Sequence, residues 1–195
     1  MSAETFVNQS EASAGRDIIG GDKHVNSALH NHFHPAPSGR ATVVEQLLEK
    51  LGAEIASNSQ TATVVEELLY FYEKKSHDGV NGLKAKLEKA GRSDEYDRAI
   101  EKKEKFVKLL EKWSMFSSAQ DIFVFLLARA DNEYHSKILP HISLIDRASF
   151  NAIVDNNIVE PVVSDCGASV FKINHGTAMG MFYWLAEQCF VRWHK

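Results

Sequence analysis

Residues 179–195, "MGMFYWLAEQCFVRWHK", form an almost continuous run of large apolar side chains that decides how this chain folds. Terminal segments are usually polar and frayed. Burying one large aromatic side chain stabilises a fold by about 1.5–3 kcal/mol, and this run contains several. We therefore expect Phe182 and Leu185 to lie in the core and Trp193 to hold this end of the chain in place.

Length and composition limit the class of protein. The 195 residues suit one domain, or one domain with an appendage, and the net charge of -4 argues against a general DNA-binding protein. Two cysteines do not make a disulfide framework, which indicates a reducing compartment. The N-terminus lacks the basic and apolar regions of a signal peptide, and residues 122–130 are too short for a membrane span. We expect a cytoplasmic protein that does not enter a membrane.

Residues 40–92 are predicted to form a helical hairpin region. "TVVEQLLEKLG" (42–52) and "TVVEELLYFYEKK" (63–75) each begin with Thr and carry Glu three residues later, the pattern of a capping box. Both show an amphipathic apolar stripe, so they resemble a pair of similar helices. A third, weaker helix is expected within "HDGVNGLKAKLEKAG" (77–91), with Gly82 near its start and Gly91 at its end.

Residues 93–195 are predicted to form a C-terminal interaction domain. Apolar residues at 3.6 spacing indicate a long helix over 93–113, and 117–138 is apolar almost all round, as expected of a central helix that Pro140 ends. A short helix should stop near Asn156–Asn157, before an extended piece leading to Pro161. The alternation in "ASVFKI" (168–173) favours a short strand before the final helix. The predicted fold class is mostly α, with a small β element near the C-terminus and a glycine-rich N-terminal arm.

The arm comprises residues 1–39 and has no helical periodicity. Its segment "AGRDIIGGDKHVN" (14–26) places Ile18 and Ile19 between glycines, a pattern that permits turns and close backbone approach. One hypothesis is that water satisfies its backbone groups and the arm is disordered. The other, which we favour, is β-augmentation, in which the segment adds to a sheet edge of another copy or of a partner.

Two groups of residues are candidates for chemistry. His30, His32 and His34 alternate in "HNHFH", so their imidazoles would share one side of an extended backbone and could bind a metal ion. Alternate histidines rarely complete a closed site alone, and a solvated polar segment is the favoured interpretation. Cys166, with His175 nearby in sequence, is the other candidate, but no nucleophile motif surrounds it and a small buried residue is favoured. We predict no metal, no cofactor and no enzymatic activity.

Residues 84–112 carry ten Lys or Arg and seven Asp or Glu, a local charge of +3. This segment could dock nucleic acid or an acidic partner. The alternative, which the mixed signs favour, is a solvated helix face with ion pairs four residues apart, such as Glu101–Lys105 and Glu104–Lys108. We expect weak, strongly salt-dependent DNA binding, or none.

The ending of the chain resembles the C-terminal domains of bacterial three-component ABC-ATPase conflict systems, which include the Lamassu-type anti-phage systems. Those domains close with a Gly-Met-aliphatic-Tyr-aromatic-Leu segment, then Cys, then an aliphatic residue and Arg-Trp. The residues in the matching places are Gly180, Met181, Tyr183, Leu185, Cys189, Val191, Arg192 and Trp193. The segments "ILPHI" (138–142), "IVEPVV" (158–163) and "AGRDIIGGDKH" (14–24) also resemble parts of these proteins.

The resemblance implies an architecture of three proteins. An SMC- or Rad50-like ABC ATPase senses foreign nucleic acid, a middle component bridges, and a third protein joins an N-terminal effector to this C-terminal domain. The 39 residues before Arg40 are too few for an effector enzyme, so docking and assembly are what the resemblance carries over. The expected partners are the ATPase, the other subunits, and a second copy through the arm. The residues predicted to bind partners are Ile18, Ile19, Lys102, Lys105, Arg192 and Trp193.

Overall fold

The computed structural model describes residues 41–75 and 79–194, and within these ranges the chain is helical with no β-strand. Its α-helices are α1 (Val43–Ser57), α2 (Glu66–Tyr72), α3 (Gly82–Lys89), α4 (Tyr96–Trp113), α5 (Ser117–Glu133), α6 (Arg147–Val154), α7 (Glu160–Cys166) and α8 (His175–Glu187). Short 3-10 turns cover Ser93–Glu95 and Leu139–His141, and π-helical turns cover Tyr134–Ile138 and Asp155–Val159.

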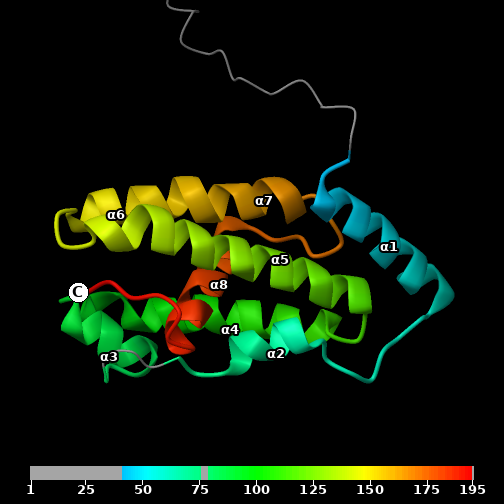
Figure 1. Cartoon of the computed structure of the whole chain (residues 1–195), viewed down its shortest axis with the longest axis horizontal. Coiled ribbons are helices and arrows are strands. Elements are labelled where there is room, and N and C mark those ends of the chain that lie inside the picture. Colours follow the sequence, from blue (N-terminus) through cyan, green and yellow to red (C-terminus); the bar gives the residue numbers. More distant parts are fainter. Residues whose placement is uncertain (1–40, 76–78, 195) are drawn as a thin grey trace, which may run out of the picture. The chain divides into compact units, whose positions relative to one another are not determined.

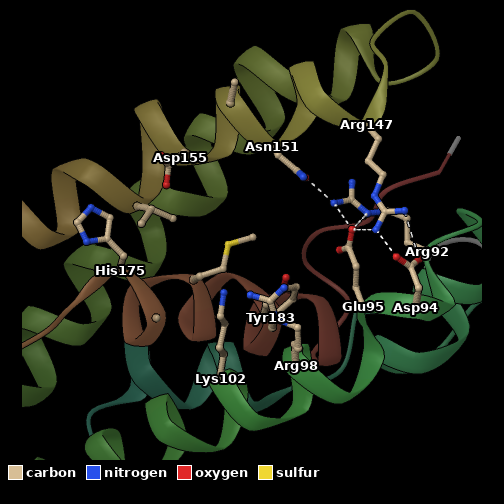
Figure 2. Close-up of a pocket in the computed structure, with 14 residues that line it drawn as sticks. Arg92, Asp94, Glu95, Arg98, Lys102, Arg147, Asn151, Asp155, His175 and Tyr183 are labelled. Carbon is tan, nitrogen blue, oxygen red and sulfur yellow. Dashed lines mark hydrogen bonds and ion pairs between the residues drawn. The ribbon is translucent and has the colours of Figure 1, made fainter.

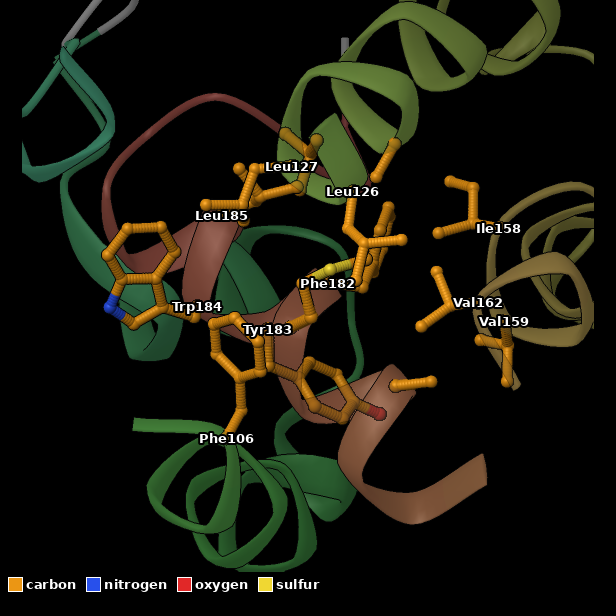
Figure 3. Close-up of a cluster of buried hydrophobic side chains, with 14 of the residues drawn as sticks. Phe106, Leu126, Leu127, Ile158, Val159, Val162, Phe182, Tyr183, Trp184 and Leu185 are labelled. Atoms are coloured by element: carbon orange, nitrogen blue, oxygen red, sulfur yellow. The ribbon is translucent and has the colours of Figure 1, made fainter. Parts of the chain in front are cut away.

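Helix α8 lies at the centre of the core. It contacts α3, α4, α5 and α7, and eight of its residues are buried: Ala178, Gly180, Met181, Phe182, Tyr183, Trp184, Leu185 and Ala186. Figure 3 shows its side chains meeting Phe106 of α4, Leu126 and Leu127 of α5, and Ile158, Val159 and Val162 around the second π turn. Phe182 and Leu185 are fully buried, which confirms the expectation from the apolar run.

Helix α5 is the second core helix, as its apolar sequence predicts. It lies between the α6–α7 segment and the helices α2 and α4, and α1 packs across it near the N-terminal end of α5 (Figure 1). Eight of its 17 residues are buried. Gln120, fully buried, binds the backbone before α2: its Oε1 accepts from Val65 N at 2.7 Å, and its Nε2 donates to Thr63 O at 2.9 Å.

The two π turns keep long apolar stripes facing the core. From α5 into its π turn, every fourth residue is buried: Ser118, Ile122, Leu126, Ala130, Tyr134 and Ile138. From α6 to α7 the same spacing recurs: Phe150, Val154, Ile158, Val162 and Cys166. Four residues of α-helix turn the chain by about 400°, so such a stripe drifts by about 40° per step. A π turn, with its wider i→i+5 bonding, offsets this drift.

This arrangement corrects the prediction of an extended piece before Pro161. The chain stays helical from α6 through the π turn into α7, and Pro161 occupies the first turn of α7, where its missing N–H is tolerated. The prediction of a helix stop at Asn156–Asn157 is also wrong, because both residues lie inside the π turn. Asn157 Nδ2 instead donates to Ile153 O at 2.9 Å and satisfies a backbone carbonyl of α6.

The predicted β element at 168–173 is wrong as well. Its residues form a turn: Lys172 N donates to Ser169 O, and Phe171 N donates to Ser169 Oγ. Lys172 has a φ of 50°, which breaks an extended backbone. Phe171 and Ile173 are buried and Val170 is half exposed, so the alternation is real, but the described residues offer no neighbouring strand to pair with it.

The first two helices differ from each other despite their similar sequences. Thr42 caps α1 with the predicted capping box, in which Glu45 N donates to Thr42 Oγ1 and Thr42 N donates to Glu45. Helix α2 begins only at Glu66, with no side-chain cap, because Gln120 holds the preceding backbone extended. Rather than pairing chiefly with each other, α1 packs on α5 and α7, and α2 packs on α5.

Candidate interaction site

The contact between α4 and α8 depends on Gly180. A Cβ at this position would lie 2.1 Å from Lys102 O and 3.2 Å from Phe106 Cβ. The two helix backbones therefore meet without a side chain between them, as glycine alone permits. Lys102 of α4 and two residues of α8, Met179 and Tyr183, line the same cleft beside this contact.

A cleft of about 580 Å³ lies above this contact, between α4, α8 and the segment from α6 to the second π turn. The residues that line it are Arg92, Asp94, Glu95, Arg98, Lys102, Arg147, Asn151, Ala152, Asp155, Val159, His175, Gly176, Met179 and Tyr183. In Figure 2, Arg98 and Lys102 extend from α4 toward the opposite wall, which carries Asn151 and Asp155. The volume falls in the range of ordinary ligand pockets.

One end of the cleft is closed by a network of ion pairs. Arg92, 5% exposed, pairs with Glu95 at 3.0 Å, donates to Asn151, and lies over the rings of Phe150 and Trp193. Arg147 pairs with Glu95 and, at 2.6 Å, with Asp94. The Arg147 hydrogen bond lowers the pKa of Asp94 below its usual value. The charges at this end are therefore mutually neutralised, and they tie the 3-10 turn before α4 to α6.

The middle of the cleft holds charges of a different kind. Arg98 and Lys102 lie one turn apart on α4 and form no ion pair or hydrogen bond within the described residues. Asp155, on the facing wall, also has no such partner among residues 41–75 and 79–194. Met179, Val159 and Ala152 contribute apolar surface to the lining of the cleft. The cleft thus has a positive wall, a negative wall and an apolar part.

Tyr183 adds a hydroxyl donor to this arrangement. Its side chain is 5% exposed and lines the cleft, yet its hydroxyl forms no hydrogen bond with any described residue. Burial, followed by the charge of Glu95, raises the pKa of Tyr183, while Arg92, Arg98 and Arg147 act in the opposite direction. The phenol is therefore protonated at neutral pH and positioned among the charged groups of the cleft.

The C-terminal tail is fixed to the core, as the aromatic run predicts. Trp193 is 7% exposed and contacts the rings of Phe182 and Tyr183. Tyr134 exchanges hydrogen bonds with the backbone of Arg192, donating to its carbonyl at 3.1 Å and accepting from its N–H at 3.2 Å. Lys86, 2% exposed, donates to the carbonyls of Ala186 and Val191 at 2.9 and 2.8 Å.

The residues predicted to bind partners lie in different environments. Lys102 lines the cleft, whereas Lys105 points elsewhere and pairs with Glu101 at 2.6 Å, which confirms that predicted ion pair. That hydrogen bond is the main reason why the pKa of Glu101 is lowered. Trp193 is a core residue that also lines a smaller pocket of about 290 Å³, and Arg192 borders another of about 220 Å³.

The other predicted positions do not form a described site. Ile18, Ile19, His30, His32 and His34 lie outside the described residues, so their roles remain predictions. Within the described ranges, no group of three His, Cys, Asp or Glu side chains could hold a metal ion, and no helix there is long and apolar enough to cross a membrane.

Cys166 is a small buried residue, as the sequence analysis favoured. Its side chain is fully buried, and burial followed by the charge of Asp165 raises the pKa of its thiol to about 12. A nucleophilic cysteine reacts as the thiolate, which this environment suppresses at neutral pH. Asp165 is instead paired with Arg129 at 2.7 Å.

Sequence reasoning missed Arg98, Asp155 and Tyr183 as members of the cleft. The i,i+4 spacing of Arg98 and Lys102 was a usable signal for a shared position on α4. Tyr183 gave none, because its place in an apolar run indicates a core residue and not a hydroxyl that faces a cleft.

Comparison with protein families identifies the domain that carries this cleft. Residues 82–193 match the family model of C-terminal domain 9 of the ABC-three component (ABC-3C) systems. The chain belongs to this family. Comparisons with curated proteins and with solved structures found no significant match. The ABC-3C domain runs from the start of α3 to Trp193, so it contains every residue that lines the cleft, while α1 and α2 precede it.

Membership confirms the resemblance drawn from residues 180–193. It makes the protein a component of a multi-subunit system whose other components are its partners. Gly180 and Tyr183, two positions of the closing segment, now have structural reasons: the first brings α4 and α8 together, and the second directs a hydroxyl into the cleft.

Proposed function

We propose that this chain is a non-enzymatic assembly subunit of an ABC-3C anti-phage system, and that it docks to the SMC- or Rad50-like ABC ATPase or to the middle component. The observation that carries the proposal is the family match over residues 82–193. A domain that belongs to one component of a three-component system is expected to bind at least one of the other two components. Cys166 is buried, and Lys86 holds the C-terminal tail by a hydrogen bond to Ala186 O. Both side chains therefore stabilise the fold, which supports a non-enzymatic role.

A reconstitution experiment tests this proposal. The full chain, tagged, is co-expressed with the other two components of its own system, and complexes are measured by size-exclusion chromatography with light scattering. We expect a complex of fixed stoichiometry with the ATPase or the middle component. The control replaces both partners with those of a different ABC-3C system. A chain that elutes alone at the mass of its free form, with its own partners present, would contradict the proposal.

Two alternatives remain, and each has a direct test. An enzyme would need a metal ion on His30, His32 and His34 or a reactive thiol, so metal content is measured on untagged protein; stoichiometric metal would favour it. A nucleic-acid adaptor would use the Lys-rich helices α3 and α4, where the excess of +3 neutralises few phosphates. Binding tighter than about 1 µM at about 200 mM salt would favour the adaptor. Oligomerisation through the arm also remains a prediction.

A further inference from the structure

We propose that the cleft between α4, α8 and the second π turn is the docking site for an acidic protein segment of another component, with a carboxylate of that segment bound by Arg98 and Lys102. The inference rests on the proposed function and gives it a site and a partner chemistry. Three independent features of the cleft support it.

The first feature is the pair of cations. Arg98 and Lys102 occupy adjacent turns of α4, where side chains four residues apart are neighbours. Neither has an ion pair in the described part of the chain, although acidic residues are plentiful nearby and Lys105, one turn further, is paired with Glu101. Arginine and lysine together bind a carboxylate through charge-assisted hydrogen bonds, which are stronger than neutral ones.

The second feature is the hydroxyl of Tyr183. It is a donor on a side chain that is 95% buried, and no described residue accepts its hydrogen bond. Because the hydroxyl opens into the cleft while the ring is held by the core, it is a fixed donor that a carboxylate oxygen in the cleft could accept from. Its pKa shift shows the electrostatic influence of Arg98, which places the phenol and the guanidinium in one region of the cleft.

The third feature distinguishes a protein from a polyanion. Asp155 faces the cations across the cleft (Figure 2), and Met179, Val159 and Ala152 give its lining an apolar part. A nucleic acid or a nucleotide polyphosphate offers only negative charge and would be repelled by Asp155. A protein segment can offer a carboxylate to α4, an apolar side chain to Met179, and an amide or cation to Asp155.

The test measures affinity between the purified full chain and each of the other two components. The variant R98E/K102E reverses both cations. The matched control, K84E/K108E, makes the same change in charge at exposed lysines of α3 and α4 that do not line the cleft. Tyr183→Phe removes only the hydroxyl. All variants are first checked for unchanged thermal melting.

We expect R98E/K102E to bind its partner at least about tenfold more weakly, Tyr183→Phe about threefold to tenfold more weakly, and K84E/K108E within about twofold of the wild type. A wild-type chain that binds neither component overturns the proposed function and the docking site with it. A double variant that binds as tightly as the wild type overturns the docking site alone. An equal loss of affinity in R98E/K102E and K84E/K108E also overturns the docking site, because it would show a general charge effect. The docking site is likewise overturned if R98E/K102E abolishes binding of ATP or an oligonucleotide while partner binding stays intact.

Discussion

Replacing Gly180 with alanine tests the close contact that builds the core. The added Cβ would lie 2.1 Å from Lys102 O and 2.7 Å from Lys102 C, and both are backbone atoms that cannot rotate away. Because real Cβ contacts stay above 3.0 Å, α4 and α8 must separate locally by about 1 Å. Overpacking of this kind costs about 1–3 kcal/mol and occasionally more, while alanine gains about 1 kcal/mol over glycine in a helix.

The severity of the clash puts the expected net loss for Gly180→Ala at about 2–4 kcal/mol of unfolding free energy. Urea denaturation followed by far-UV circular dichroism measures it. Gly52 supplies a matched control: it lies inside α1, and a Cβ there would meet nothing within 4 Å. Gly52→Ala should therefore stabilise the protein by about 0.5–1 kcal/mol. If both variants are stabilised to the same extent, the backbone contact between α4 and α8 is not as described.

Four further predictions concern the tail and the buried polar groups. Removing residues 188–195 should give an unfolded or aggregating product, because it exposes the core around Trp193 and takes Val191 O from Lys86; a monodisperse product with unchanged melting would contradict this. Lys86→Met should cost about 2–4 kcal/mol in urea denaturation, since it leaves two buried carbonyls without their donor, and a neutral result would show that water replaces it. The Cys166 thiol should resist iodoacetamide at neutral pH until the protein unfolds, as mass spectrometry would show. The pKa of this thiol is about 12 in the folded protein and 9.0 in the unfolded chain. Its protonated form therefore contributes fully to the free energy of unfolding below pH 9.0, and this contribution is lost as the pH rises toward 12. Cys166→Ala should flatten the decline of the free energy of unfolding at alkaline pH. Tyr72 and Tyr183 also have raised pKa values and should retain their share of the decline.

The sequence predicted the helices whose apolar residues follow 3.6 spacing and are bounded by recognisable end signals. Helix α4 and the end of α3 at Gly91, with its φ of 66°, are examples. The tail was predicted because its aromatic residues have no stable solution except burial. The interruption before Pro161 was wrong, since a four-residue apolar spacing signals a helix with a π turn, whereas proline and two asparagines suggest a break.

The cleft could be predicted only in part. Lys102 was a candidate because it belongs to a charged helix, but which cations stay unpaired depends on where the acidic side chains of other segments lie. Arg147 comes from α6 and pairs with Asp94 and Glu95, which precede Arg98 by four and three residues along the chain. Which cations of α4 stay without an ion pair therefore depends on the tertiary structure, and no local sequence pattern predicts it.

The π turns also determine where this fold tolerates a change in chain length. Each holds one residue more per turn of backbone than an α-helix would. Deleting a single residue from Asp155–Val159 would restore α-helical winding, and the four residues left would turn the chain by about 400°, close to what the five residues of the π turn do now. Phe150 and Val154 would then still share one side with Val162 and Cys166, whereas a deletion within the regular part of α6 or α7 would rotate the residues after it by about 100°. Natural length variation of one residue should therefore be tolerated at this turn and be absent from the regular helix on either side of it.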